Sequence, residues 1–243
     1  MKTFIATFIV TLAALAIFRL NSIAPSIRAT FSSDTYLNRH TKYQITLLIL
    51  AGIVLVLTYF QNPENFKLLF SIGNISAPAE PVSWFGIGLD RSWIYVGFYL
   101  CILITMGTLT FVYLQFRHLK MSITYVLPYL GWILLFSFAN SFSEEAIFRL
   151  GIIVPALGHI DASYIVLISA AVFGLAHFGG MPHGLIGMLM AGLLGWFLAK
   201  SVIETQGIFW AWSIHLIQDV VIYFGFMLNR IKQTQYANET FIN

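Results

Sequence analysis

Long stretches of the chain contain no Asp, Glu, Lys or Arg, and these stretches constrain the fold more than any other feature. Four of them are Thr3–Phe18, Tyr43–Pro63, Ser92–Phe116 and Met121–Ser143. An α-helix needs roughly 20 mostly apolar residues to cross a bilayer, and three of the four stretches reach that length. Only 9% of the 243 residues are charged and 58% are hydrophobic, which a water-facing globule could not accommodate. The sequence therefore predicts a multi-pass integral membrane protein.

The hydropathy pattern divides the chain into eight helical segments. The loop at 62–91 is expected to be irregular, and the polar run at 140–143 fits either a break between two helices or one bent helix. We expect an all-α transmembrane helix bundle of about eight helices, with residues 1–243 forming a single membrane-embedded domain. The expected segments are 3–20, 43–61, 92–116, 122–141, 142–157, 162–178, 183–200 and 207–228.

Loop charge predicts an orientation. Residues 19–42 hold four basic side chains against one acidic side chain, and 117–120 add two basic ones, whereas 62–91 hold two basic against three acidic. Cytoplasmic loops are enriched in Lys and Arg, so the first and third loops are expected in the cytoplasm. With eight helices, this count places both termini outside. The basic residues are scattered in short loops, so no nucleic-acid partner is expected.

Ionisable residues are concentrated in the predicted helices of the last hundred residues. A charge near the membrane centre costs about 2.5–3.5 kcal/mol on insertion scales, so such groups persist where they pair, line a wet cavity or take part in chemistry. Three pairs are spaced four residues apart, which places each pair on one helix face. The pairs are Glu145 with Arg149, Phe173 with His177, and His215 with Asp219, and Glu144 precedes the first pair.

Helix direction gives an independent reason to expect these residues to meet. In an up-and-down bundle Glu144 opens the fifth segment and His177 closes the sixth, so both lie toward the same side. His215 and Asp219 lie near the middle of the eighth segment, which runs in the same direction as the sixth. The four side chains are therefore expected in one cavity, which the charge count puts toward the outer face.

Structural interpretations compete with a catalytic one for each residue taken alone. Ser141-Phe-Ser-Glu144 fits a capping box at a helix start. Glu145 and Arg149 fit a structural ion pair. The histidine of the second pair fits a hydrogen-bonded core position, and the third pair fits a clamp between helices. Four separate structural explanations in one chain are together less probable than a single site that these residues share.

The three pairs, in their order, resemble the motifs of the CAAX-prenyl endopeptidase and bacteriocin-processing (CPBP) family, also called Abi proteins. The motifs read Glu144-Glu145-x-x-x-Arg149, Phe173-x-x-x-His177 and His215-x-x-x-Asp219, within a catalytic core at about 122–228. The resemblance implies an intramembrane endopeptidase in which Glu144 is the general base that activates water, helped by His177. It also implies that Glu145 and Arg149 support the motif helix, and that His215 and Asp219 bind the oxyanion or a metal.

Metal use is left open by the sequence. Glu144, His177, His215 and Asp219 form a candidate zinc set, since catalytic zinc takes three protein ligands and a water. Asp219 stands where some family members have Asn, and an ionised Asp binds a cation but cannot donate to an oxyanion. The His-Glu-x-x-His zinc motif is absent from the sequence. Zinc is therefore the one candidate cofactor.

The resemblance also implies the partners and the location of the protein. The substrate is expected to be a membrane-associated peptide or a prenylated protein, and the small size favours a bacterial cell membrane. In the family's prenyl-processing members the active site opens toward the cytosol, whereas the charge count puts the cavity toward the outer face. The sequence therefore does not decide from which side of the membrane the site is reached. A non-catalytic scaffold or bacteriocin-immunity protein is the alternative function. A small transporter with a carboxylate proton relay is less favoured, because no inverted repeat is evident.

Overall fold

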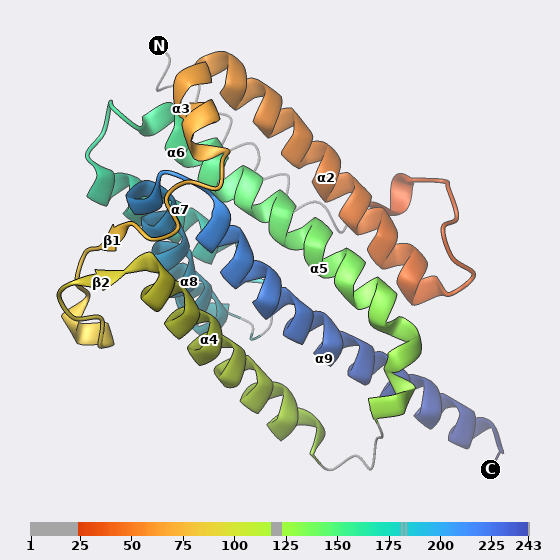
Figure 1. Ribbon diagram of the computed structural model, residues 1–243. Helices are drawn as coiled ribbons and strands as arrows, with labels where there is room; N and C mark the ends of the chain where they lie inside the picture. Colours follow the sequence, from red (N-terminus) through yellow and green to blue (C-terminus); the bar gives the residue numbers. More distant parts are fainter. Residues whose placement is uncertain (1–23, 118–122, 181, 183, 243) are drawn as a thin grey trace.

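The described part of the chain forms a helix bundle with one very short strand pair (Figure 1). The computed structural model describes residues 24–117, 123–180, 182 and 184–242, with side chains in the last helix as far as Lys232. The expected helix at 3–20 lies outside these residues. The predicted all-α transmembrane architecture is confirmed for the rest of the chain.

The elements follow the predicted order, with some shifted ends. The expected segment 43–61 begins two turns earlier, and the loop at 62–91 contains a short helix and two paired strands. The helices are α2 (Thr35–Gln61), α3 (Pro63–Leu69), α4 (Trp93–Phe116), α5 (Leu130–Glu145), α6 (Gly151–Ala156), α7 (Ala162–Ala176), α8 (Gly184–Thr205) and α9 (Phe209–Ile242), with a π-helical turn, η5 (Ala146–Leu150), between α5 and α6, and strands β1 (Pro78–Ala79) and β2 (Arg91–Ser92).

The polar run at 140–143 lies inside a helix. α5, η5 and α6 follow one another without a gap. The chain therefore forms one continuous helix here and not two. Ser137 and Ser141 are fully buried, and their hydroxyls donate to carbonyls of the preceding turn. Glu144 therefore lies in the middle of a helix. Both the capping-box interpretation and the expected place of Glu144 at a helix start are wrong, because α5 begins at Leu130 and continues through these residues.

Four helices of the described chain are long and apolar enough to cross a membrane. They are α2, α4, α8 and the part of α9 at Phe209–Lys232, while α7 is a shorter apolar helix. α5 lies between α2 and α9, and α4 packs on α9 (Figure 1). α7 packs along α8 so closely that a Cβ at Gly174 would lie 2.6 Å from the carbonyl oxygen of Met188. The protein is thus an integral membrane protein whose α5 and α9 share a central interface.

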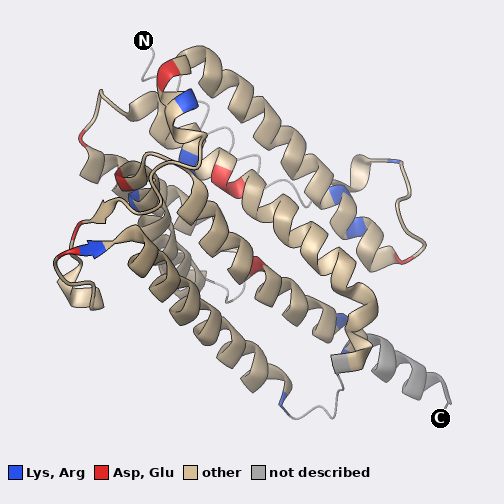
Figure 2. Cartoon of the chain, in the orientation of Figure 1, with Lys and Arg blue, Asp and Glu red and all other residues tan. Residues whose placement is uncertain are grey.

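Lys and Arg lie toward both ends of the bundle, and some Asp and Glu lie midway along α5 and α9 (Figure 2). At the end where α2 begins, Arg230 of α9 forms an ion pair with Asp34, and Arg28, Arg39 and Lys42 lie nearby in the chain. We call this the basic end. The opposite, acidic end carries the 62–91 loop, which contacts the α8–α9 turn through Asn74 N and Thr205 O.

With the basic end in the cytoplasm, α9 also ends there. The expectation of an outer C-terminus counted α5 and α6 as two spans, whereas the structure has one continuous helix there.

Candidate active site

Three helices bring the four predicted catalytic side chains together. Glu144 lies near the end of α5, His177 caps the end of α7, and His215 and Asp219 are one turn apart in α9. Glu144 Oε2 lies 3.7 Å from His177 Nε2 and 3.6 Å from His215 Nε2. His215 Nε2 lies 3.7 Å from Asp219 Oδ1. We call these four residues the carboxylate–histidine cluster.

The two oxygens of Glu144 have different surroundings. Oε1 accepts a hydrogen bond from Asn140 Nδ2 at 3.1 Å. Oε2 is buried and, among the described residues, has no direct hydrogen-bond partner. Its distances to the two imidazoles exceed the roughly 2.7–3.2 Å of a direct hydrogen bond, and a water molecule can bridge polar groups at such separations. One carboxylate oxygen is therefore held by the protein, and the other has no direct partner among the described residues.

Both imidazoles have their Nδ1 atom engaged by an acceptor. His215 Nδ1 lies 2.7 Å from Glu145 Oε1, and His177 Nδ1 lies 2.8 Å from the carbonyl oxygen of Phe173. Carboxylate and carbonyl oxygens only accept, so Nδ1 donates its N–H in each ring. These bonds fix the ring orientation and turn both Nε2 atoms toward Glu144.

Beneath the cluster lies a fully buried ion pair. Glu145 Oε2 is 3.1 Å from Arg149 Nε, and neither residue is exposed to solvent. Arg149 also donates to Ser169 Oγ of α7 at 3.2 Å and lies over the Phe173 ring at 4.4 Å. Glu145 thus connects α5 to α7 through Arg149 and to α9 through His215. The π-helical turn η5 contains Arg149, and such turns occur frequently at functional sites.

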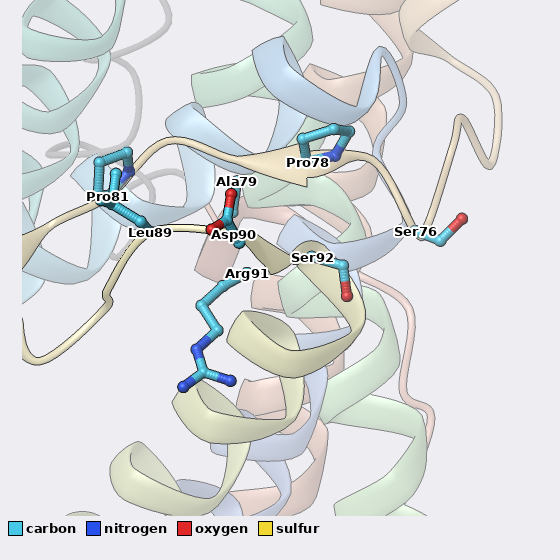
Figure 3. A pocket seen from close by; sticks show the side chains of 8 residues that line it. All are labelled: Ser76, Pro78, Ala79, Pro81, Leu89, Asp90, Arg91 and Ser92. Carbon is cyan, nitrogen blue, oxygen red and sulfur yellow. The ribbon is translucent and has the colours of Figure 1, made fainter.

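Exposure differs across the cluster. The side chain of His177 is 33% exposed, whereas Glu144 is 10% exposed and His215 and Asp219 are 5% exposed. His177 therefore forms the accessible edge, and the other three side chains lie behind it. A separate surface hollow at the acidic end is formed by the loop around β1 and β2, with Pro78, Asp90 and Arg91 among its lining residues (Figure 3). No member of the cluster lines that hollow.

Sequence reasoning missed Asn140 as a site residue. Its Nδ2 atom donates to Glu144 Oε1 and to Asp219 Oδ2, both at 3.1 Å. An uncharged amide in an apolar segment gives no signal in a search for ionisable residues. The available signal was its position one helical turn before Glu144, which places the two side chains on the same helix face.

The candidate zinc set of Glu144, His177, His215 and Asp219 stays a prediction. Within the described ranges, no three His, Cys, Asp or Glu side chains are arranged so that they could hold one metal ion. Asn140 also occupies one oxygen of each carboxylate in the cluster. We therefore derive no reaction step through a metal, and metal use is left to a direct measurement.

The fold and the cluster together define a class: a helical membrane protein with two carboxylates and two histidines buried between its spans. Residues 126–221, which contain all three sequence motifs, match the family model described as type II CAAX prenyl endopeptidase Rce1-like. The matched segment, less than half of the chain, is similar to this family of CAAX endopeptidases. The similarity supports peptidase activity in general. Comparison with curated proteins and with solved structures gives no match.

Proposed function

We propose that the protein is an intramembrane endopeptidase that hydrolyses a peptide bond with a water molecule activated by Glu144. One observation carries the proposal: Glu144 Oε2 is buried, lacks a direct partner among the described residues, and lies 3.6–3.7 Å from two imidazole nitrogens. A water molecule there would contact a carboxylate base and an imidazole together. Similarity to the family supports peptide-bond hydrolysis as the reaction.

In the proposed reaction, Glu144 Oε2 takes a proton from water as the water oxygen attacks the carbonyl carbon of the substrate. His177 Nε2 accepts the second O–H of that water and so fixes its direction. The carbonyl oxygen becomes an oxyanion, and the proton held by Glu144 passes to the leaving amine when the C–N bond breaks. These steps need one base, one orienting ring and one group that stabilises negative charge.

His215 is the proposed group that stabilises the oxyanion. Its Nδ1–H is held by Glu145, so its Nε2 donates to an oxyanion when the ring carries a second proton. Asp219 Oδ1 lies 3.7 Å from that Nε2 and favours the protonated ring. An ionised Asp219 cannot itself donate a hydrogen bond, so we assign it to His215 rather than to the substrate.

The proposed substrate is a membrane-associated or prenylated peptide, and the proposed location is a bacterial cell membrane. The description of the matching family names a CAAX prenyl endopeptidase. A CAAX sequence ends in a prenylated Cys, two aliphatic residues and one further residue. A lipid-anchored peptide would reach the site from within the bilayer, where the spans of this protein lie. A peptide without the lipid is the direct comparison.

Peptide cleavage by the purified protein in detergent tests the proposal. The probe is a quenched fluorescent peptide that ends in a farnesylated Cys, two aliphatic residues and Met, compared with its unprenylated form. General acid–base groups contribute about 10²–10⁴-fold, so Glu144→Gln and His177→Ala should each lower kcat at least ~100-fold. The exposed Glu64, at the acidic end, provides the matched control Glu64→Gln.

Two results would contradict the proposed reaction. Cleavage retained in both site variants would reject Glu144 and His177 as the reacting groups. A wild-type protein that cleaves neither peptide, while its cellular function survives Glu144→Gln, would favour the non-catalytic scaffold.

Metal use has its own measurement. After dialysis against a chelator, the glutamate-type reaction proposed here should keep its rate, and metal analysis should find less than one zinc per chain. Activity that disappears on chelation and returns with added Zn²⁺ would instead assign the cluster to a metal.

A further inference from the structure

The uncharged side chain of Asn140 contacts both carboxylates of the carboxylate–histidine cluster. Its Nδ2 atom lies 3.1 Å from Glu144 Oε1 and 3.1 Å from Asp219 Oδ2. We infer that Asn140 is a positioning residue of the active site and that Gln44 and Tyr223 hold it in place. This inference rests on the proposed function, because it concerns how Glu144 is aimed at water.

The hydrogen-bonding capacity of the amide matches this role. A side-chain NH₂ group has two hydrogens, and here one is directed to each carboxylate. With Oε1 of Glu144 held in this way, the carboxylate presents Oε2 to the two imidazoles. Without the amide, the carboxylate would be free to turn about its Cγ–Cδ bond and carry its oxygen away from the imidazoles. Two negative carboxylates would also face each other without a shared donor.

The orientation of the Asn140 amide is itself fixed. Its Oδ1 atom faces Gln44 Nε2 at 3.5 Å, and Gln44 Nε2 donates to the hydroxyl of Tyr223 at 2.6 Å. Turning the amide over would place its carbonyl oxygen against two carboxylates, which only accept. Gln44 is 3% exposed and Tyr223 is 6% exposed, so water competes little for these groups.

These supporting residues come from different helices. Gln44 belongs to α2, Asn140 to α5 and Tyr223 to α9. Gln44 and Tyr223 lie outside the segment 126–221 that matches the family model. The network therefore extends the site beyond the motif-bearing core and makes α2 part of the support for the base.

Cleavage kinetics of the full-length protein test the inference. Asn140→Leu keeps approximately the same volume and removes both hydrogen bonds. We expect kcat for the farnesylated peptide to fall roughly 10- to 100-fold with KM within about twofold, since small displacements of a reacting group cost rates of that order. Gln44→Met should give a smaller loss. If Gln44 acts through Asn140, the double variant should be no slower than Asn140→Leu alone.

A matched control is available at the acidic end. Asn65 also donates two hydrogen bonds from its Nδ2 atom, to the carbonyl oxygens of Val154 and Leu157, far along the chain from the cluster. Asn65→Leu should leave kcat unchanged. Wild-type kcat in Asn140→Leu, in a protein that loses cleavage with Glu144→Gln, would overturn the inference and leave the proposed function intact.

Infrared spectra give a readout that does not require turnover. The carboxyl band of Glu144 is the band that disappears in Glu144→Gln, and it should shift in Asn140→Leu but not in Asn65→Leu. An unshifted band in Asn140→Leu would overturn the inference even where no peptide is cleaved. The absence of cleavage by the wild-type protein would count against the proposed function, whatever the band shows.

Discussion

Glu144 and Glu145 are adjacent in the chain but face different partners. Successive helical residues are rotated by about 100°, so one carboxylate points toward the imidazole Nε2 atoms and the other toward Arg149. Glu145 makes the contacts expected of a structural charge, with a fully buried partner. Glu144 has one open oxygen, which is what a general base requires.

Replacing each glutamate with glutamine should separate these two roles. Glu144→Gln should abolish cleavage with little change in thermal stability. Glu145→Gln leaves Arg149 buried without its counter-charge, and breaking a buried pair from one side costs about 3–5 kcal/mol. We therefore expect a clear fall in the midpoint of thermal unfolding in detergent for Glu145→Gln alone. Equal unfolding midpoints for the two variants would refute this division of labour.

At single positions, charge was the signal that sequence reasoning could use. The charged and histidine members of the cluster were identified because such residues are costly in a membrane. Asn140, Gln44 and Tyr223 escaped because neutral polar residues in apolar segments are common and give no spacing pattern of their own. Their importance depends on contacts between α2, α5 and α9, which the sequence does not reveal.

Among the elements, α7 places the most accessible member of the cluster. It is a 15-residue helix, about 22 Å long at 1.5 Å per residue, and His177 caps its end. Its position depends on close packing against α8, where a Cβ at Gly174 would lie 2.6 Å from Met188 O and 3.1 Å from Gly192 Cα. Backbone atoms cannot move aside as a flexible side chain can.

Gly174→Ala should therefore disturb both stability and activity. Overpacking of this kind costs about 1–3 kcal/mol, and moving α7 displaces His177 from Glu144. We expect a lower unfolding midpoint and a lower kcat. Gly52→Ala in α2 is the control, because a Cβ there meets nothing within 4 Å. A Gly174→Ala protein with wild-type stability and rate would show that α7 does not depend on this contact.

Most helices were predictable from hydropathy, and the exception has a physical cause. Residues 140–143 read as a break because a lipid-facing helix would not carry two serines and an asparagine. In the structure Ser141 and Ser143 are buried inside the bundle, and the Ser141 hydroxyl bonds to Phe138 O. An internal helix tolerates such residues because the protein, rather than lipid, surrounds them. Hydropathy alone cannot distinguish the two surroundings.

For the whole molecule, the continuous α5–η5–α6 helix changes the side of the membrane from which substrate is expected to reach the cluster. With two helices at this place, the loop charges put the cluster toward the outer face. With one, α7 runs from the acidic end toward the basic end, so His177 at its end is directed to the basic side. Basic loops are expected on the cytoplasmic side, which predicts that the accessible edge of the cluster faces that side.

This orientation predicts which introduced cysteines an impermeant maleimide will reach. In a Cys101→Ser background, which removes the only native thiol, Leu89→Cys lies at the acidic end, where Leu89 is 75% exposed. Ser33→Cys lies at the exposed basic end beside the start of α2. Leu89→Cys should be labelled in intact cells and Ser33→Cys only after permeabilisation, since the positive-inside bias fixes the basic loops in the cytoplasm. The reverse pattern would put His177 toward the outer face and remove the cytoplasmic route for the substrate.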